Sequence, residues 1–258
     1  HYTRLVTRNP EYGMDYADIR ILNTDAHIDD FSVIEGAVRG HIKSFAADEL
    51  GGFRIDHLSG VMLVDRGIIH VDDMCIKTPH STINMPRMHI DGVSWEQYKN
   101  YIDEVQMDIV AENSTVSTAD IGYFAPALRN WGLVLSNADV TYKGTVDDFE
   151  AEVRNADFGQ SSRIDAKAHI IGMPDWRTAN YIIGVEDMHL TSQDARKVIS
   201  SVVKQPLSPK VVQIIDRVGW VDMRATFGGA FDSFKVTGNV NSGAGHLRTN
   251  VALSTSKR

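Results

Sequence analysis

The sequence predicts a mainly β protein whose antiparallel strands form a sheet with one apolar and one polar face. Period-two alternation dominates the chain; Val221, Met223 and Phe227, for example, alternate with polar residues, and residues two apart on a strand share a face. Gly, Asn and Asp punctuate the alternating segments at intervals of about 10 to 15 residues, as in all-β folds. Helical patterns are few and do not alternate regularly with strands, which disfavours a doubly wound α/β sheet.

The alternating segments follow one another along almost the whole chain. Within residues 163–170, Ile164 and Ile170 share one parity, and Asp165 and Lys167 share the other. A single solvated face is typical of antiparallel sheets. The expected strands cover residues 18–28, 39–47, 52–64, 67–76, 81–90, 105–111, 133–144, 147–153, 163–170, 180–190 and 221–227, followed by the two arms of a hairpin within 234–254.

Short helices are expected between some of these strands. Ser117 is followed three residues later by Asp120, a variant of the capping box, and Thr191 is a cap before an Ile/Val stripe. Gly219 ends a stretch with apolar residues at spacings of three and four. Such helices are expected to plug or cap the ends of the sheet. They cover residues 94–102, 117–128, 191–203 and 210–218.

The chain is interpreted as one elongated module spanning residues 1–258. A weak repeat (Asp-x-Phe, strand, Asn/Gly-rich turn, basic residue, strand) occurs in 147–170 and again in 232–253. Tandem hairpins stacked along an axis produce such a pattern. The expected sections are β-rich 17–92, a helical insert at about 94–128, β-rich 131–190, a helical insert at 191–218 and a β-hairpin repeat at 219–254.

Composition narrows the possible partners. The net charge is −8 without a basic stripe, so nucleic acid is not an expected partner.

Cys75 is the single cysteine, which excludes an internal disulfide, and its side chain is interpreted as a small buried hydrophobe. No apolar run approaches the ~20 residues of a membrane-spanning helix. Because the chain begins at His1 without a methionine, we expect a segment of a longer protein, with any anchor outside it.

The sequence offers only weak candidates for a catalytic or metal-binding site. The motif His-x-Asp occurs three times, with histidines at 27, 70 and 89; each pair is expected on the solvated face, and a metal site requires two pairs to converge. Adjacent carboxylates at 29/30, 72/73 and 147/148 are interpreted as turn residues, because neighbours on a strand point to opposite faces. We therefore expect no catalytic residue, no metal and no cofactor.

Three quoted segments resemble a known family. "LSGVMLVDRGIIHVDDMCIKTPHSTI" (58–83), "STADIGYFAPAL" (117–128) and "WVDMRATFGGAFDSFKVTGNVNSGAGHLRTNVALS" (220–254) are similar to motifs of translocation and assembly module B (TamB) proteins of Bacteroidetes-type bacteria. This family belongs to the AsmA-like group. The resemblance covers most of the chain from about Leu22 to Ser254. The stretch 191–218 departs from the family pattern and is expected to interrupt the sheet.

The resemblance implies a fold and a function. The fold is a long sheet curled into an open, U-shaped groove, called a β-taco. The family is periplasmic and held in the inner membrane by an N-terminal helix that lies outside this segment. Its members are linked to phospholipid transfer between inner and outer membranes, and to outer-membrane protein assembly with a barrel partner. Here that partner would be contacted through regions outside this segment.

An apolar groove for phospholipid acyl chains is therefore expected on one face of the strands. Alternatively, the same side chains form the core of an ordinary sandwich, as in a structural or adhesin-like module whose sheet edge pairs with another chain. A carbohydrate-active enzyme requires two convergent carboxylates, which no spacing here supplies. The groove candidates are Val221, Met223, Phe227, Phe234, Val236, Val240, Leu247, Val251, Leu253, Ile164 and Ile170.

Overall fold

The chain forms one antiparallel sheet of thirteen strands, each hydrogen-bonded to the strands before and after it in sequence. The computed structural model describes residues 12–13, 20–124, 128–175, 177–230 and 232–254, apart from the side chains at 202 and 253. The strands are β1 (Ile21–Ile34), β2 (Ala37–Glu49), β3 (Arg54–Asp65), β4 (Ile68–Lys77), β5 (Thr82–Asp91), β6 (Gln106–Ser117), β7 (Val134–Gly144), β8 (Asp148–Phe158), β9 (Ser162–Ile171), β10 (Asn180–Thr191), β11 (Trp220–Ala230), β12 (Ser233–Ser242) and β13 (Gly245–Ser254).

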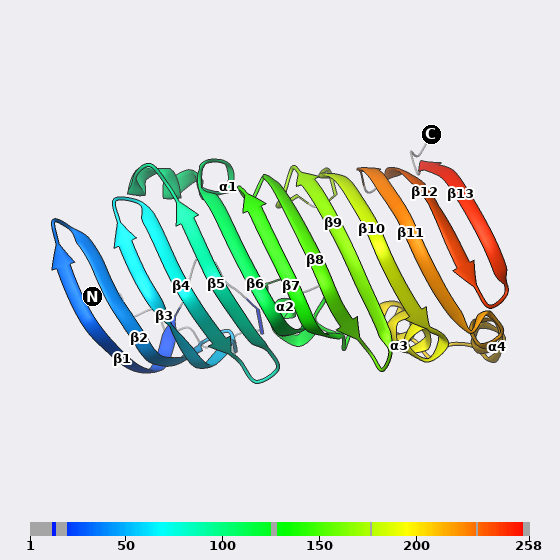
Figure 1. Cartoon of the computed structure of the whole chain (residues 1–258), viewed down its shortest axis with the longest axis horizontal. Helices are drawn as coiled ribbons and strands as arrows, with labels where there is room; N and C mark the ends of the chain where they lie inside the picture. Colours follow the sequence, from blue (N-terminus) through cyan, green and yellow to red (C-terminus); the bar gives the residue numbers. More distant parts are fainter. Residues whose placement is uncertain (1–11, 14–19, 125–127, 176, 231, 255–258) are drawn as a thin grey trace, which may run out of the picture.

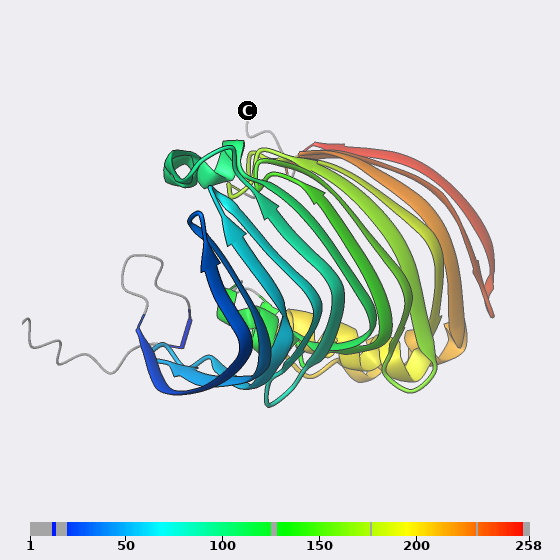
Figure 2. The ribbon, with the colours of Figure 1, turned by 60° about the vertical axis from the view of Figure 1, so that its left-hand side comes forward.

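The sheet is long, curled and open, as Figures 1 and 2 show. It does not close, because β1 and β13 form its two edges. Sequential antiparallel pairing requires only short turns, which explains the regular spacing of Gly, Asn and Asp. The predicted fold class, an elongated antiparallel sheet curled into an open groove with a few short helices, is confirmed.

The helices lie at the ends of the strands. The element η1 (Trp95–Asn100) and α1 (Tyr101–Glu104) occupy one end, whereas α2 (Thr118–Phe124), α3 (Ser192–Val203) and α4 (Pro209–Val218) lie along the opposite end (Figure 1). The stretch 94–128 is not a continuous helical insert, because β6 lies inside it. The expectation that 191–218 interrupts the sheet is wrong: β10 pairs directly with β11, from Asn180 opposite Ala230 to Thr191 opposite Trp220.

β-Bulges bend the sheet along a line across its strands. Asp73, Asn113, Asn137 and Asn155 all have positive φ, between 43° and 55°, and the strand register shifts beside each of them. Asn and Asp tolerate this left-handed conformation better than other non-glycine residues, and a bulge bends the strand that contains it. Asp73, interpreted above as a turn residue, therefore lies in a bulge within β4.

The apolar face is the inner face of this bend. Ser114, Ala138 and Ala156 lie on it beside the bulges and are fully buried, whereas Asn113 and Asn155 on the other face are exposed. Side chains converge on the concave side of a bent sheet and diverge on the convex side. Small residues therefore occupy the inner corner, and we call the two sides the inner and outer faces.

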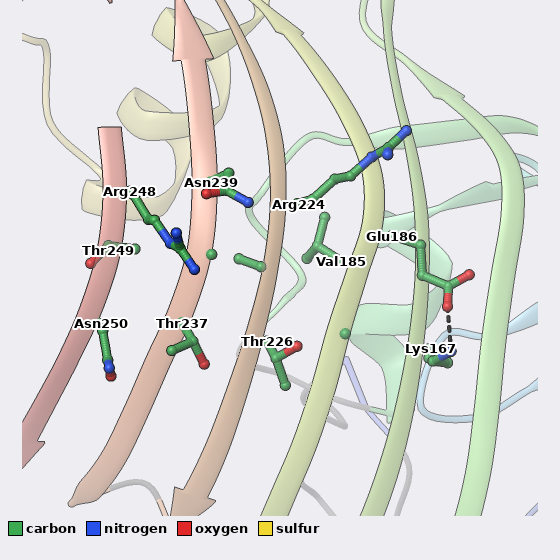
Figure 3. Close-up of a pocket in the computed structure, with 13 residues that line it drawn as sticks. Lys167, Val185, Glu186, Arg224, Thr226, Thr237, Asn239, Arg248, Thr249 and Asn250 are labelled. Atoms are coloured by element: carbon green, nitrogen blue, oxygen red, sulfur yellow. Dashed lines mark ion pairs between the residues drawn. The ribbon is translucent and has the colours of Figure 1, made fainter. Parts of the chain in front are cut away.

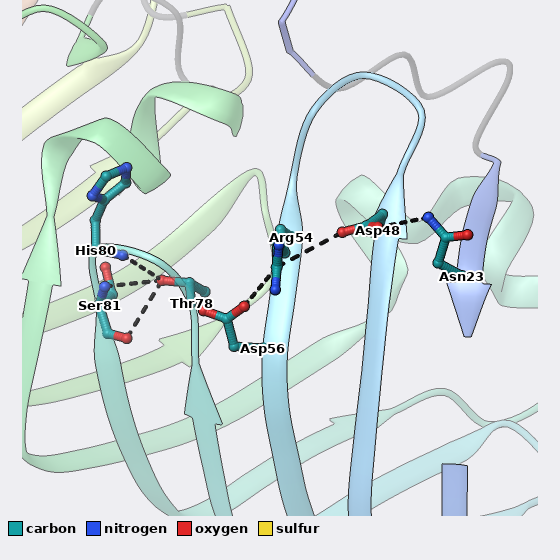
Figure 4. Close-up of polar contacts among 7 residues, drawn as sticks. All are labelled: Asn23, Asp48, Arg54, Asp56, Thr78, His80 and Ser81. Carbon is teal, nitrogen blue, oxygen red and sulfur yellow. Dashed lines mark hydrogen bonds and ion pairs between the residues drawn. The ribbon is translucent and has the colours of Figure 1, made fainter. Parts of the chain in front are cut away.

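Polar contacts connect neighbouring strands on the outer face. Near the N-terminal edge, Asn23 Nδ2 donates to Asp48 Oδ2 at 2.8 Å, Arg54 Nε lies 3.9 Å from Asp48, and Arg54 Nε donates to Asp56 at 2.6 Å (Figure 4). At the β4–β5 turn, Thr78 Oγ1 accepts the Ser81 backbone N–H at 2.9 Å. These contacts tie β1, β2 and β3 together and define the turn.

Two buried aspartates attach helices to strand turns in the same way. Asp120 at the start of α2 accepts from Ser81 Oγ at 2.5 Å, and Asp194 at the start of α3 accepts from Ser162 Oγ at 2.8 Å. Each serine oxygen in turn accepts the N–H of the last strand residue before the helix, Ser117 or Thr191. The expected caps at Ser117 and Thr191 thus belong to a repeated arrangement whose serine partners lie more than 25 residues away.

Candidate functional site: the apolar inner face

The strand register assigns ten of the eleven groove candidates to three cross-strand rows on the inner face, and Val221 lies outside these rows on the same face. The first row runs from β9 to β13 and passes through Met188 on β10. Its groove candidates are Ile164, Met223, Val240 and Leu247. We call the other two rows the Phe227 row and the Phe234 row. The Phe227 row holds Phe227, Val236 and Val251. The Phe234 row joins Ile170 through Tyr181 and Gly229 to the register positions of Phe234 and Leu253. Val221 lies two residues before Met223 on β11, opposite Leu190 and Ser242.

The Phe227 row crosses the sheet from β3 to β13 with an apolar residue or Tyr on every strand. Eleven strands spaced about 4.8 Å apart give a path of roughly 48 Å. The groove candidates chosen from the sequence did not include the members of this row on β3–β10, although the same parity marks them in the sequence. The row consists of Met62, Val71, Met88, Ile109, Tyr142, Ala151, Ala168, Ile183, Phe227, Val236 and Val251.

No second sheet covers the inner face within the described residues, because all thirteen strands belong to one sheet. The sandwich core considered from the sequence is therefore absent from this part of the chain. Leu247 is 60% exposed and Val251 is 44% exposed. Towards the middle of the sheet, Val71, Ala111, Val185 and similar side chains become buried by their own neighbours, as expected where a sheet curls. The face is thus apolar, open and continuous.

Tyr142 lies on the inner face near the end of β7 and is half-buried there. Burial raises the pKa of the Tyr142 phenol to about 12, because a low dielectric disfavours the phenolate. Its ring stacks on Phe149 with centroids 4.7 Å apart, and its hydroxyl donates to the Thr145 carbonyl at 2.6 Å. Burial also raises the pKa of Tyr181, farther along the face, with a smaller contribution from Asp175. Both tyrosine rings are therefore partly withdrawn from water by their neighbours on the inner face.

The outer face is polar and crossed by ion pairs. Lys167 on β9 pairs with Glu186 on β10, and Arg224 and Arg248 extend over a shallow hollow between β9 and β13 (Figure 3). Arg163 Nη2 lies 2.9 Å from Asp187. Threonine and asparagine side chains line the rest of this hollow. Such exposed pairs contribute little energy singly, but cross-strand pairs help to specify the register.

Two of the three His-x-Asp pairs converge on the outer face. His70 bonds to Asp91 at 2.5 Å and His89 bonds to Asp72 at 2.8 Å, so each histidine pairs across to the neighbouring strand. The two imidazole rings stack with centroids 3.8 Å apart. His27 bonds to Asp29 on its own strand. Over the described ranges, no group of three or more His, Cys, Asp or Glu side chains has the geometry to hold a metal ion.

Comparison with family models, curated proteins and solved structures finds no match to this chain. Among the described helices, none is long and apolar enough to span a bilayer. Over the described residues, the structure is a single-layer curled β-sheet with an apolar inner face that no second sheet covers and an ion-paired outer face.

Proposed function

We propose that the inner face is a groove that carries phospholipid acyl chains without catalysing a reaction. The observation that supports this function is the Phe227 row, which offers an apolar side chain or a tyrosine ring on each strand from β3 to β13, with no facing layer over the described part of the sheet. A path for an acyl chain requires continuous apolar surface and no reactive group.

The driving force is large compared with what one protein contact supplies. Burying each CH₂ is worth ~0.8 kcal/mol, so a 16-carbon chain removed from water gains about 12 kcal/mol. The exposed faces of Leu247 and Val251 gain in the same exchange. Part of this gain is offset by ordering the chain and by the loss of translational freedom. The net binding free energy is therefore smaller than this gross gain.

The resemblance to TamB proteins sets the cellular context of the proposal. The segment would lie in the periplasm as part of a protein anchored in the inner membrane, and would pass phospholipid between inner and outer membranes or assist outer-membrane protein assembly. An adhesin-like module would instead use the unpaired edges of β1 and β13. The adhesin-like model needs no ligand on the inner face, so lipid contact along that face discriminates between the two.

Photo-crosslinking at adjacent positions tests the proposal. Ile182 and Ile183 are neighbours on β10 with the same side chain, but Ile183 belongs to the inner Phe227 row and Ile182 is exposed on the outer face. A photoreactive residue at position 183 should yield phospholipid adducts in membranes, whereas the same residue at 182 should not. Positions 251 and 250 on β13 form a second pair of the same design.

Mass spectrometry of the adducts identifies the lipid. Adducts at 183 and 251 without adducts at 182 and 250 support the groove. Equal adducts on both faces, or none at 183 and 251 in folded protein, would falsify it.

A further inference from the structure

The α3–α4 hairpin carries an exposed apolar patch at the end of the sheet. Ile214 on α4 is 63% exposed, and Val211, one turn earlier, is also exposed. Ile199 and Val203, one turn apart on α3, are exposed as well, and so is Trp220, which follows the Gly219 cap of α4. Figure 1 shows the two helices together beside the ends of β10 and β11. Residues three or four apart share a helix face, so these side chains form stripes.

The same hairpin is basic in an acidic protein. Residues 191–218 contain five Lys or Arg and two Asp, a net charge of 5 − 2 = +3, whereas the whole chain carries −8. Neither aspartate neutralises the other four cations, because Asp194 is buried and Asp216 pairs with Arg196 at 2.7 Å. The remaining cations have no ion-pair partner within the described residues; they are Lys197, Lys204, Lys210 and Arg217.

The cations border the apolar patch. On α4, Lys210 precedes Ile214 by four residues and Arg217 follows it by three, so both charges lie on the side of the helix that exposes Ile214. Capping residues also define the ends of both helices in the hairpin. Thr191 and Ser208 cap the two helices, and Gly219 ends α4.

We infer that the α3–α4 hairpin docks on the surface of a bilayer rich in anionic phospholipid. An amphipathic helix with cations beside an apolar stripe lies in the interface plane, with the apolar side chains among the acyl chains and the cations at the headgroups. Each Lys or Arg near an anionic surface contributes about a fivefold gain in partitioning. The occupant is a bilayer surface, because the free cations match a negatively charged headgroup layer.

Docking would set the groove beside its lipid source. The hairpin joins β10 to β11, so its docking brings the ends of strands that carry Ile183 and Phe227 next to the membrane. This role goes beyond acyl-chain binding by the inner face, and the two can fail separately. Lipid adducts at position 183 report on the groove, and vesicle binding reports on the hairpin.

Vesicle co-sedimentation of the 258-residue protein tests the inference. Vesicles of phosphatidylcholine with one quarter phosphatidylglycerol should bind the protein, and pure phosphatidylcholine should bind it far more weakly. The double variant Lys210→Gln/Arg217→Gln should bind the anionic vesicles roughly 30-fold more weakly. Ile214→Ser should also weaken binding.

The control makes the same charge change elsewhere. Lys77 and Lys235 are exposed on β4 and β12, and Lys77→Gln/Lys235→Gln should bind like the parent. Circular dichroism confirms that each variant is folded. Unchanged binding of Lys210→Gln/Arg217→Gln, an equal loss in the control, or equal binding to both vesicle types overturns the inference.

Discussion

Replacing Asp194 with alanine should destabilise the whole sheet, because this carboxylate joins a strand turn to a helix. Asp194 is 1% exposed and accepts hydrogen bonds from Ser162 Oγ at 2.8 Å, Gln160 N at 3.0 Å, Ser161 N at 3.2 Å and Thr191 Oγ1 at 3.0 Å. Burial acts to raise the pKa of Asp194, but these hydrogen bonds outweigh it, so the pKa lies below its usual value. The Asp194 carboxylate is therefore ionised at neutral pH, and both of its oxygens accept hydrogen bonds.

The expected loss follows from the groups left behind. A hydrogen bond to a charged group contributes about 1.5–3 kcal/mol, and an orphaned buried donor costs about 1–3 kcal/mol. Asp194→Ala orphans Ser162 Oγ and the Gln160 N–H in a turn where Gly159 approaches the carboxylate closely. Because several neutral donors lose their acceptor at once and these terms are not additive, we expect a fall of about 3–5 kcal/mol in the free energy of unfolding.

Urea denaturation followed by circular dichroism measures this loss. Asp120→Ala should behave similarly, because Asp120 holds the β4–β5 turn to α2 through Thr78 and Ser81. The control is Asp187→Ala, which removes solvent-accessible pairs with Arg163 and Arg224 and should cost less than about 1 kcal/mol. If Asp194→Ala loses no more than this control, the buried carboxylate does not hold the turn and the reasoning fails.

Two further predictions concern the bulges and acid sensitivity. Asn113→Ala should lower stability by about 1–2 kcal/mol in urea titrations, because its φ of 43° is unfavourable for Ala, whereas Asn113→Gly should cost much less; equal losses would contradict this. Hydrogen bonds from Asn113 N and Asn155 Nδ2 lower the pKa of Asp139, only partly opposed by burial, and the pKa of Asp194 is also lowered. The unfolded chain therefore binds more protons near pH 4, so stability should fall as pH drops below about 4. Asp139→Asn should flatten that fall, and unchanged acid unfolding would count against it.

The strands were predictable because a sheet with one apolar and one polar face requires apolar and polar residues to alternate along each strand. Phe227 and Val236 alternate with polar neighbours on their own strands, and the register then places them opposite each other. The helix starts at Thr118 and Ser192 were near their predicted positions because capping residues act locally.

The resemblance predicted a curled sheet, but the positions of the bulges could not be predicted from the residues because their signal is ambiguous. Asp73 and Asn155 occur in bulges, but the same residue types are equally common in turns. A bulge also shifts parity within a strand, so pattern analysis loses the face beyond it. The serine partners of the buried aspartates, Ser81 and Ser162, were missed because such contacts join distant parts of the chain.

An open groove requires a sheet that keeps its shape without a second layer, and this sheet has two devices for that purpose. Left-handed residues such as Asn113 and Asn155 build the bend into the backbone, and outer-face pairs such as Lys167–Glu186 and Arg163–Asp187 connect neighbouring strands from the convex side. The inner apolar side chains are then not needed as a core that must interlock with another sheet. On the proposed function, an acyl chain would therefore enter and leave the face without unpacking the protein.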